Sequence, residues 1–322
     1  MTYLKIFLLL LLVSIYPFSY GQNWPTKPIK IIAPSTPGGP PDVYARAIAD
    51  YLSKSLSQPV VVENVPAAGG MIAAQSVMKG TNDGSLLLVN TAGMMTITPA
   101  ANPNAKYHAE DFAQICQGVS ASLILAAHPS LGVKSFPDLT KWLKNQKAQA
   151  TYSSYSMGSP AHLLGFQMSE LLGLDMVHVP YKSTPQQLTD MVAGVAPLGF
   201  VQLATATPNV KAGKLIALAV TSESRSSDLP QVPTVSELGY PQLQTTVWFG
   251  LSGSKSLSPS IVKKLIELHQ QMSNTSEFEA RMSNAGLVVS KNICGDVFTK
   301  KIVAESESWA KIIKAAGFVA DN

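Results

Sequence analysis

Short aliphatic runs alternate with segments of helical periodicity along most of this chain, and this alternation restricts the possible folds more than any other feature. Residues 29–33, 60–62 and 86–89 form the first three runs. Between them lie residues 42–57 and 71–79, which have the spacing of amphipathic helices. Strands that alternate with helices in this way predict an α/β fold with a parallel sheet and right-handed crossovers.

The same alternation continues through the middle of the chain and changes character near its end. Further strands are expected at residues 123–127, 150–153, 177–179, 198–201, 216–220 and 247–251. Further helices are expected at residues 159–172, 184–193, 259–274 and 297–316. The last part of the chain therefore adds one strand and two long helices to the earlier pattern.

A chain of 322 residues has the length of two α/β lobes. We expect lobe 1 to consist of residues 22–122 and 245–322, and lobe 2, inserted into it, of residues 123–244. The two crossings between the lobes would form a hinge. The cleft beside such a hinge is the natural place for a ligand.

The first 21 residues have the pattern of a secretory signal peptide. Lys5 precedes the apolar run 6–13, and Ser19 and Gly21 are small residues at positions −3 and −1 of a cut before Gln22. A membrane anchor is the alternative, but the run is shorter than the roughly 18 residues that a spanning helix needs. We therefore expect a protein that is cleaved near Gly21 and works in the periplasm.

Charge and cysteine content narrow the function further. The formal net charge is +4, and the basic residues are scattered without interleaved aromatic residues, so nucleic acid is not an expected partner. Cys116 and Cys294 are the two cysteines. They form either a disulfide or two buried free thiols, and the sequence leaves both open. No His or Cys lies at ligand spacing to either one, so neither a metal nor a cofactor is expected.

Three loops between a predicted strand and a predicted helix present glycines and hydroxyl groups. They span residues 36–42, 64–71 and 153–162. Glycine lets the backbone approach a ligand closely, and the N-terminus of the following helix adds a partial positive charge. The loops therefore predict a site in which neutral donors hold an anion, although Gly-Gly also occurs in simple turns. They match neither a Walker A nor a dinucleotide-binding sequence.

A serine hydrolase is the enzymatic alternative. Ser159 precedes His162 by about one helical turn, so the two residues could be neighbours. However, the chain lacks a Gly-x-Ser-x-Gly sequence, and no orienting acid is evident for this pair. We therefore assign no catalytic residue and expect a binding protein.

An ordered set of short motifs resembles a known family. The first motifs are Pro37-Gly38-Gly39-x-x-Asp42, Glu63-Asn64-x-Pro66-x-Ala68-Gly69-Gly70, Gly158-Ser159-x-x-His162 and His178-Val179-Pro180-Tyr181-Lys182. The later motifs are Ala219-Val220-Thr221-Ser222, Leu229-Pro230-x-Val232-Pro233-Thr234 and Glu237-x-Gly239-Tyr240-Pro241. From about Trp24 to its C-terminus, the chain is similar to the Bug family of periplasmic solute-binding proteins, which are the receptors of tripartite tricarboxylate transporters.

The resemblance implies a periplasmic-binding-protein-like Venus flytrap that captures a small monocarboxylate, dicarboxylate or aromatic acid. It implies ligand contacts in lobe 1 from Thr36, Pro37, Gly38, Gly39, Asp42, Ala67, Ala68 and Gly69. It implies contacts in lobe 2 from Ser156, Gly158, Ser159, His162, Lys182, Ser183 and Val201. The implied partners are the ligand and two integral-membrane transporter subunits, and we expect a monomer. A receptor that signals to a sensory partner would keep the same cleft and stays an open alternative.

Three departures from the family pattern bear on the choice of ligand. Pro40 and Pro41 stand where the family has Gly-Thr, which removes two N–H donors and a hydroxyl. Val201 stands where the family often has an Asp, and Ser183 replaces a glycine. We therefore expect a ligand that is less polar than an acidic amino acid, such as an aromatic or longer-chain acid.

Overall fold

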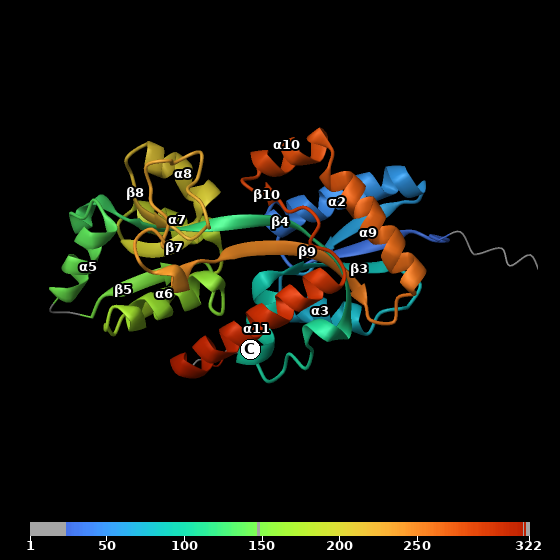
Figure 1. Ribbon diagram of the computed structural model, residues 1–322, viewed down its shortest axis with the longest axis horizontal. Helices are drawn as coiled ribbons and strands as arrows, with labels where there is room; N and C mark the ends of the chain where they lie inside the picture. Colours follow the sequence, from blue (N-terminus) through green and yellow to red (C-terminus); the bar gives the residue numbers. More distant parts are fainter. Residues whose placement is uncertain (1–23, 147–148, 318, 320–322) are drawn as a thin grey trace, which may run out of the picture.

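Two long strands, β4 (Phe112–Ala127) and β9 (Thr246–Ser254), run between two α/β lobes (Figure 1). The structure is a computed structural model that describes residues 24–146, 149–317 and 319. The predicted signal peptide, residues 1–21, lies outside the described residues. Within these ranges, no helix has both the length and the apolar character needed to span a bilayer.

Lobe 1 contains a mixed sheet in the order β2-β1-β3-β9-β4. Strand β1 (Ile29–Ala33) pairs in parallel with β2 (Val60–Asn64) and β3 (Leu86–Thr91), whereas β9 is antiparallel to β3. The short strand β10 (Val288–Val289) pairs with β4. The helical segments of this lobe are α2 (Pro40–Leu56), η1 (Ala68–Gly70), α3 (Met71–Met78), η2 (Gly93–Ile97), α4 (Thr98–Ala101), η3 (Ala109–Asp111), α9 (Pro259–Ser273), α10 (Ser276–Asn284) and α11 (Asp296–Ala316).

Lobe 2 continues the sheet through β4 in the order β4-β7-β5-β6, and β8 also pairs with β4. Its other strands are β5 (Thr151–Ser154), β6 (Val177–Pro180), β7 (Leu198–Gln202) and β8 (Ile216–Val220). Its helical segments are η4 (Pro129–Leu131), α5 (Phe136–Lys144), α6 (Pro160–Leu171), α7 (Thr184–Val192), α8 (Leu203–Lys211) and η5 (Pro241–Leu243).

Strand β4 changes its partners where it passes from one lobe to the other. Residues 112–122 pair antiparallel with β9, and residues 123–127 pair antiparallel with β7 and β8. On this basis we propose the predicted division of the chain, with lobe 2 inserted between residues 122 and 245.

Prolines and hydroxyl caps determine where several of these helices begin. A proline stands in the first or second position of α2, α5, α6, α7 and α9, where its missing N–H is not needed and its fixed φ suits the helix. Helix α2 therefore begins at Pro40, two residues before the predicted start. Four of these helices, α5, α6, α7 and α9, are also capped by a serine side chain that accepts a hydrogen bond from an amide, and Thr275 caps α10 in the same way; the serines are Ser135, Ser159, Ser183 and Ser258.

Several elements lack the pattern from which they could be predicted. The first part of β4 buries Gln114, which accepts a hydrogen bond from Asn90 at 3.0 Å, and Gln117, which accepts one from Lys301. These buried polar residues interrupt the alternation that indicates a strand. Helix α10 buries only Phe278 and Met282, too little apolar surface to mark a helical face.

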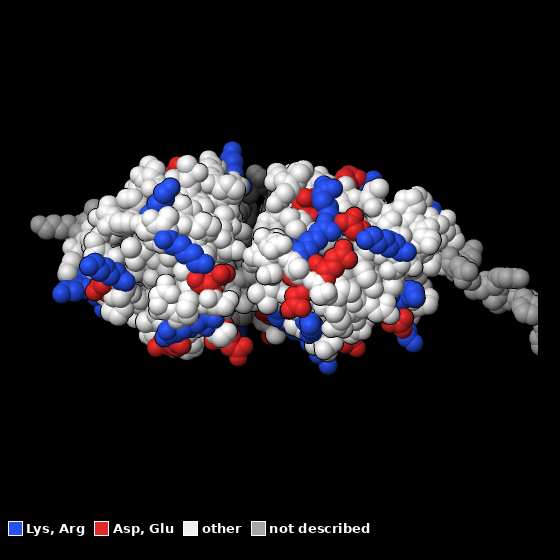
Figure 2. Space-filling view, turned by 90° about the horizontal axis from the view of Figure 1, so that it is seen from above, with Lys and Arg blue, Asp and Glu red and all other residues white. Residues whose placement is uncertain are grey.

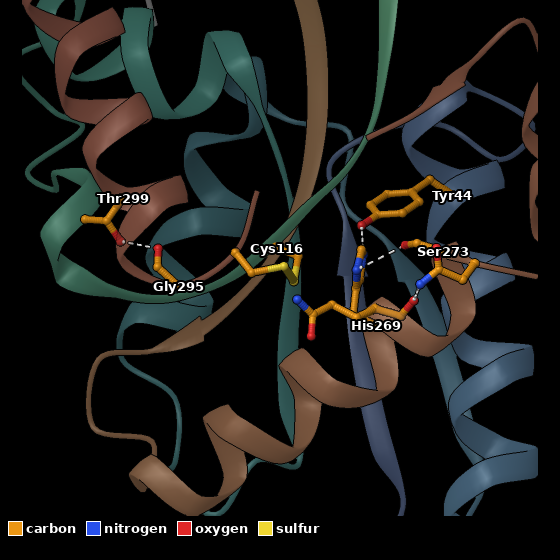
Figure 3. Close-up of a disulfide and its surroundings, with 9 residues drawn as sticks. Tyr44, Cys116, His269, Ser273, Gly295 and Thr299 are labelled. Carbon is orange, nitrogen blue, oxygen red and sulfur yellow. Dashed lines mark hydrogen bonds between the residues drawn. A yellow bond between two sulfur atoms is a disulfide. The ribbon is translucent and has the colours of Figure 1, made fainter. Parts of the chain in front are cut away.

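A disulfide between Cys116 of β4 and Cys294 ties the C-terminal segment to the sheet (Figure 3). The alternative of two free thiols is thereby excluded. Beside the disulfide, Tyr44 Oη lies 2.7 Å from His269 Nε2, and Ser273 Oγ lies 3.4 Å from His269 Nδ1. The three groups Cys116, Cys294 and His269 lie close enough to hold a metal ion, but sulfur atoms that are bonded to each other offer no thiolate ligand.

The double substitution Cys116→Ser and Cys294→Ser is expected to lower the free energy of unfolding by about 5 kcal/mol, because the bridge joins residues 178 positions apart and so restricts the unfolded chain. Urea denaturation followed by circular dichroism measures this loss. Wild-type protein reduced in denaturant serves as the control and should match the double variant. A double variant as stable as the oxidised protein would show that the bridge is energetically neutral.

Candidate functional site

Two adjoining cavities of about 310 and 1070 Å³ lie between the lobes. The walls that they share consist of Pro34, Gly69, Tyr155, Ser156 and Gln202, so the cavities are two parts of one cleft. We call the smaller one the inner cavity and the larger one the outer cavity. In Figure 2 a narrow furrow separates the two lobes, and acidic and basic side chains are interspersed over both.

The lining of the cleft holds no acidic side chain among the described residues. The residues described in the lining of the inner cavity are all uncharged, and Met94, Ile97 and Phe249 from lobe 1 face Met157 from lobe 2. In the outer cavity, the charged lining residues are Lys182 and Arg281. The cleft therefore favours an anion, and its inner part also offers apolar contacts.

Several helices begin at this cleft. The residues that precede the first turns of α2, α3, α6, α7 and α8 all line it: Gly39, Gly70, Ser159, Ser183 and Gln202. Strands in an open α/β sheet deliver their carboxyl ends, and hence the following helix N-termini, to the same edge. The partial positive charges of these N-termini add to the preference for an anion.

The structure brings together most of the residues that the sequence assigned to the site. Those that line the outer cavity are Thr36, Pro37, Gly38, Gly39, Lys182 and Ser183. Gly158 and Ser159 line the inner cavity, while Gly69 and Ser156 line both. Ala67 lies in neither lining, and Ala68 begins η1, although the side chain of Ala68 is outside the described set.

Asp42 supports the first loop from behind instead of lining the cleft. Its side chain is buried, and its carboxylate accepts hydrogen bonds from Gly38 N, Arg46 Nε and Asn64 Nδ2, each at 2.9 Å. Burial alone would raise the pKa of Asp42, but the hydrogen bonds from Arg46, Gly38 and Asn64 outweigh it and lower that pKa. The predicted ligand contact of Asp42 is thus replaced by a positioning role.

The amides of the first loop are consequently engaged within the loop. Gly38 N donates to Asp42, and Gly39 N donates to the carbonyl oxygen of Thr36 at 3.2 Å. Pro40 and Pro41 have no N–H to offer. The anion cradle that the sequence predicts in lobe 1 is therefore largely filled by the chain itself, and donors for a ligand must come mainly from the other loops.

The predicted position of Val201 in the cleft needs a correction. Val201 is fully buried in the core of lobe 2, whereas the next residue, Gln202, lines both cavities. Gln202 ends β7 and precedes α8, so it stands at the carboxyl edge of the sheet where side chains reach the cleft. The sequence reasoning placed this edge one residue too early.

Ser159 and His162 do not form a nucleophile and base. Ser159 Oγ donates to the carbonyl oxygen of Ser156 at 2.6 Å and accepts a hydrogen bond from the backbone N–H of His162. The imidazole of His162 accepts a hydrogen bond from Gly158 N at 3.1 Å and stacks on His178, with ring centroids 3.8 Å apart. His162 thus shapes the loop before α6 from the buried side, and its predicted ligand contact is replaced by support of that loop.

The sequence reasoning missed residues that arrive from distant parts of the chain. Met94 precedes α4, Phe249 lies in β9 and Arg281 lies in α10, yet all three line the cleft. They share no motif with the glycine loops. The approach of the lobes is close at Gly93, where a Cβ would lie 3.7 Å from Pro160 Cδ.

The stacked histidines predict a loss of stability in mild acid. Burial lowers the pKa of His162 to about 4, and burial together with the charge of His162 lowers the pKa of His178 to about 3, from the ordinary value of 6.5. The unfolded chain therefore binds protons first, so stability is complete above pH 6.5 and falls as the pH drops towards these values.

The melting temperature between pH 7.5 and 4.5 measures this effect, and His178→Gln is expected to make the decline shallower. His108→Gln, at an exposed position, is the matched control and should leave the slope unchanged. An equally steep decline in His178→Gln and wild type would exclude the stacked pair as its cause.

Comparisons with known proteins agree with the geometry. A model of the family described as "Tripartite tricarboxylate transporter family receptor" matches residues 44–318. Protein BugT of Bordetella pertussis is 30% identical over 303 residues, which cover 92% of this chain and 91% of BugT. Among solved structures, R. palustris Rpa4515 with adipate has a TM-score of 0.82 at 27% identity, covering 92% of this chain and 99% of that one.

MatC from Rhodopseudomonas palustris with bound malate has a TM-score of 0.79 at 25% identity, covering 90% of this chain and all of MatC. These matches confirm both the two-lobed Venus flytrap fold and the family resemblance of the sequence motifs. The chain is accordingly a solute-binding receptor and not an enzyme, and it belongs to the tripartite tricarboxylate transporter family of receptors.

Proposed function

We propose that this receptor captures a small organic carboxylate in the cleft between its lobes and delivers it to a tripartite-type membrane transporter. The observation that carries the proposal is the charge of the cleft: its described lining contains Lys182 and Arg281 and no acidic side chain. An anion entering this cleft gains attraction without repulsion from a nearby carboxylate. The relatives described above with malate and adipate bind ligands of this class.

Lys182 is the better placed of the two cations. Arg281 is already paired with Asp50 at 2.7 Å, which neutralises much of its field. Lys182 is exposed, and none of the described acidic side chains forms an ion pair with it. It follows β6 and precedes α7, so its charge adds to the N-terminus of that helix.

The inner cavity suggests an apolar body for the ligand. Met157 is 45% exposed and faces the space lined by Met94, Ile97 and Phe249. A flexible thioether beside aliphatic and aromatic side chains suits an apolar group of variable shape. We therefore infer an aromatic or longer-chain acid whose carboxylate points towards the outer cavity, with Lys182 at its edge.

The proposal also covers how the receptor reaches the periplasm and which proteins it meets there. Export would follow cleavage of the signal peptide near Gly21, and a monomeric receptor would then meet two integral-membrane subunits. The family match supports such subunits because its receptors serve tripartite transporters.

A thermal-shift panel tests the ligand class. At 100 times the dissociation constant, a bound acid stabilises the folded protein by about 2.7 kcal/mol and raises its melting temperature by several degrees. Benzoate and adipate should act, whereas benzamide and adipamide, which match them in shape without the charge, should not. Equal shifts with acids and amides, or no shift with any acid at millimolar concentration, would refute carboxylate capture.

Substitution of Lys182 tests the proposed charge. Lys182→Gln should weaken the binding of a stabilising acid roughly fivefold or more, about 1 kcal/mol, as expected for an exposed charge pair. Lys144→Gln, at the exposed end of α5 in the same lobe, makes the same change away from the cleft and should bind as wild type does. Equal affinities of the two variants would remove Lys182 from the site.

Met157→Asn should weaken binding of the longer-chain and aromatic acids while leaving short acids such as acetate unchanged, because only the apolar body loses its contact. Isothermal titration with both kinds of acid measures the difference. Met78→Asn, at a partly buried position remote from the cleft lining, controls for the chemistry of the substitution. A uniform loss for every acid would argue against the apolar inner cavity.

A further inference from the structure

The last helix, α11, starts near the middle of the molecule and runs below β9 in this view towards lobe 2 (Figure 1). Its start is fixed to lobe 1, because Cys294 is bonded to Cys116 and Gly295 N donates to the carbonyl oxygen of Ile115 at 2.9 Å. Its end carries Trp309, which is buried in the same apolar cluster as Leu164 of α6 in lobe 2. Helix α11 is therefore attached to lobe 1 at its start and packs against lobe 2 near its end.

Helix α11 and the ligand cleft lie on opposite faces of β9. Val247 and Phe249 line the inner cavity, whereas Trp248 Nε1 donates to Glu305 of α11 at 2.6 Å. Side chains alternate between the two faces of a strand, so this arrangement follows directly from the extended backbone of β9. The strand thus separates the ligand from α11.

A second cavity of about 310 Å³ lies on the α11 side, and we call it the hinge cavity. It is lined by Leu164, Gln167, Glu223, Gln242, Gln244, Thr245, Thr246, Lys301, Glu305, Ser308, Trp309 and Ile312. These residues come from α6 in lobe 2, from the chain returning to β9, and from α11. The hinge cavity therefore lies between the two lobes, on the side of β9 that faces away from the ligand cleft.

Because the ligand cleft and the hinge cavity lie on opposite sides of the hinge strands, one must narrow when the other widens. A rotation about β4 and β9 that widens the ligand cleft on one face must bring α6 and the end of α11 together on the other. Bulk in the hinge cavity opposes that rotation, and loss of bulk permits it. We propose that Trp309 and its neighbours in the hinge cavity set the balance between the open and closed receptor, and through it the affinity for the ligand.

The effect of the hinge cavity on ligand affinity rests on the proposed function. Its effect on the ratio of open to closed receptor does not. The observed dissociation constant equals the intrinsic value divided by the fraction of receptor in the competent state. A side chain that shifts the open–closed ratio therefore changes affinity without touching the ligand. Trp309 is in this sense a positioning residue, and so is any residue introduced into the hinge cavity.

Pulsed electron spin resonance on the ligand-free receptor tests the balance. Spin labels on Lys54→Cys, in the last turn of α2, and on Lys214→Cys, just after α8, report the distance between the lobes from exposed positions. The native cysteines are bonded to each other and take no label. The variants to compare are Ser308→Phe and Gln167→Phe, which fill the hinge cavity, and Trp309→Ala, which enlarges it.

Ser308→Phe and Gln167→Phe should raise the proportion of the short distance, and Trp309→Ala should raise that of the long one, each roughly fivefold in the open–closed ratio. Trp309→Phe should restore most of the wild-type distribution. Ala310→Phe is the matched control: it stands on the same helix but lines a different groove, beside Met95 and Val303, and should change nothing. Distributions in the filling variants equal to that of Ala310→Phe would overturn the proposal.

Two further measurements separate the possible failures. The melting temperature and circular dichroism of Trp309→Ala show whether it folds, and the two filling variants decide the matter if it does not. Because the distances are measured without ligand, they stand whether or not any carboxylate binds. Shifted distances with an inactive acid panel would reject carboxylate capture alone, and unshifted distances with an active panel would reject the role of the hinge cavity alone.

Discussion

The antiparallel pairing of β4 with β9 is the contact on which both lobes depend. It continues the sheet of lobe 1 to the point where β4 takes up β7 and β8, so one strand carries main-chain hydrogen bonds for two cores. The register also aims Val247 and Phe249 at the ligand cleft and Trp248 at α11. A slip of one residue would exchange these faces and lose both the cleft wall and the support of α11.

The cleft combines the fixed dipoles of helix N-termini with two cationic side chains at its outer part. Helix N-termini and amides need no counter-charge when the cleft is empty, whereas a buried lysine would have to be desolvated before a ligand arrives. Of the two cations in the described lining, Lys182 is the one without an ion pair, and it lies at the exposed edge, where water still surrounds it. This division lets the outer cavity attract an anion and leaves the inner cavity free to select among apolar bodies.

Local patterns in the sequence predicted the lobes and most of the loops that line the cleft, because strand–loop–helix order depends on near neighbours. They failed where a side chain's role depends on distant partners. The sequence motif predicted a ligand contact for Asp42, whereas in the structure its carboxylate accepts hydrogen bonds from Asn64 and Arg46. Gln202 was missed because strand ends are uncertain by a residue or more, and Arg281 because nothing in α10 refers to the glycine loops.

The hydrogen bond from Gly38 to Asp42 has a consequence for the kinetics of capture. A glycine loop that must be ordered by its ligand loses conformational entropy at the moment of binding, and that loss slows productive encounters. Here the chain supplies its own carboxylate to the loop, with Pro40 and Pro41 stiffening the turn that follows. The first loop of lobe 1 is therefore already ordered when a solute arrives, and it loses little conformational entropy on binding.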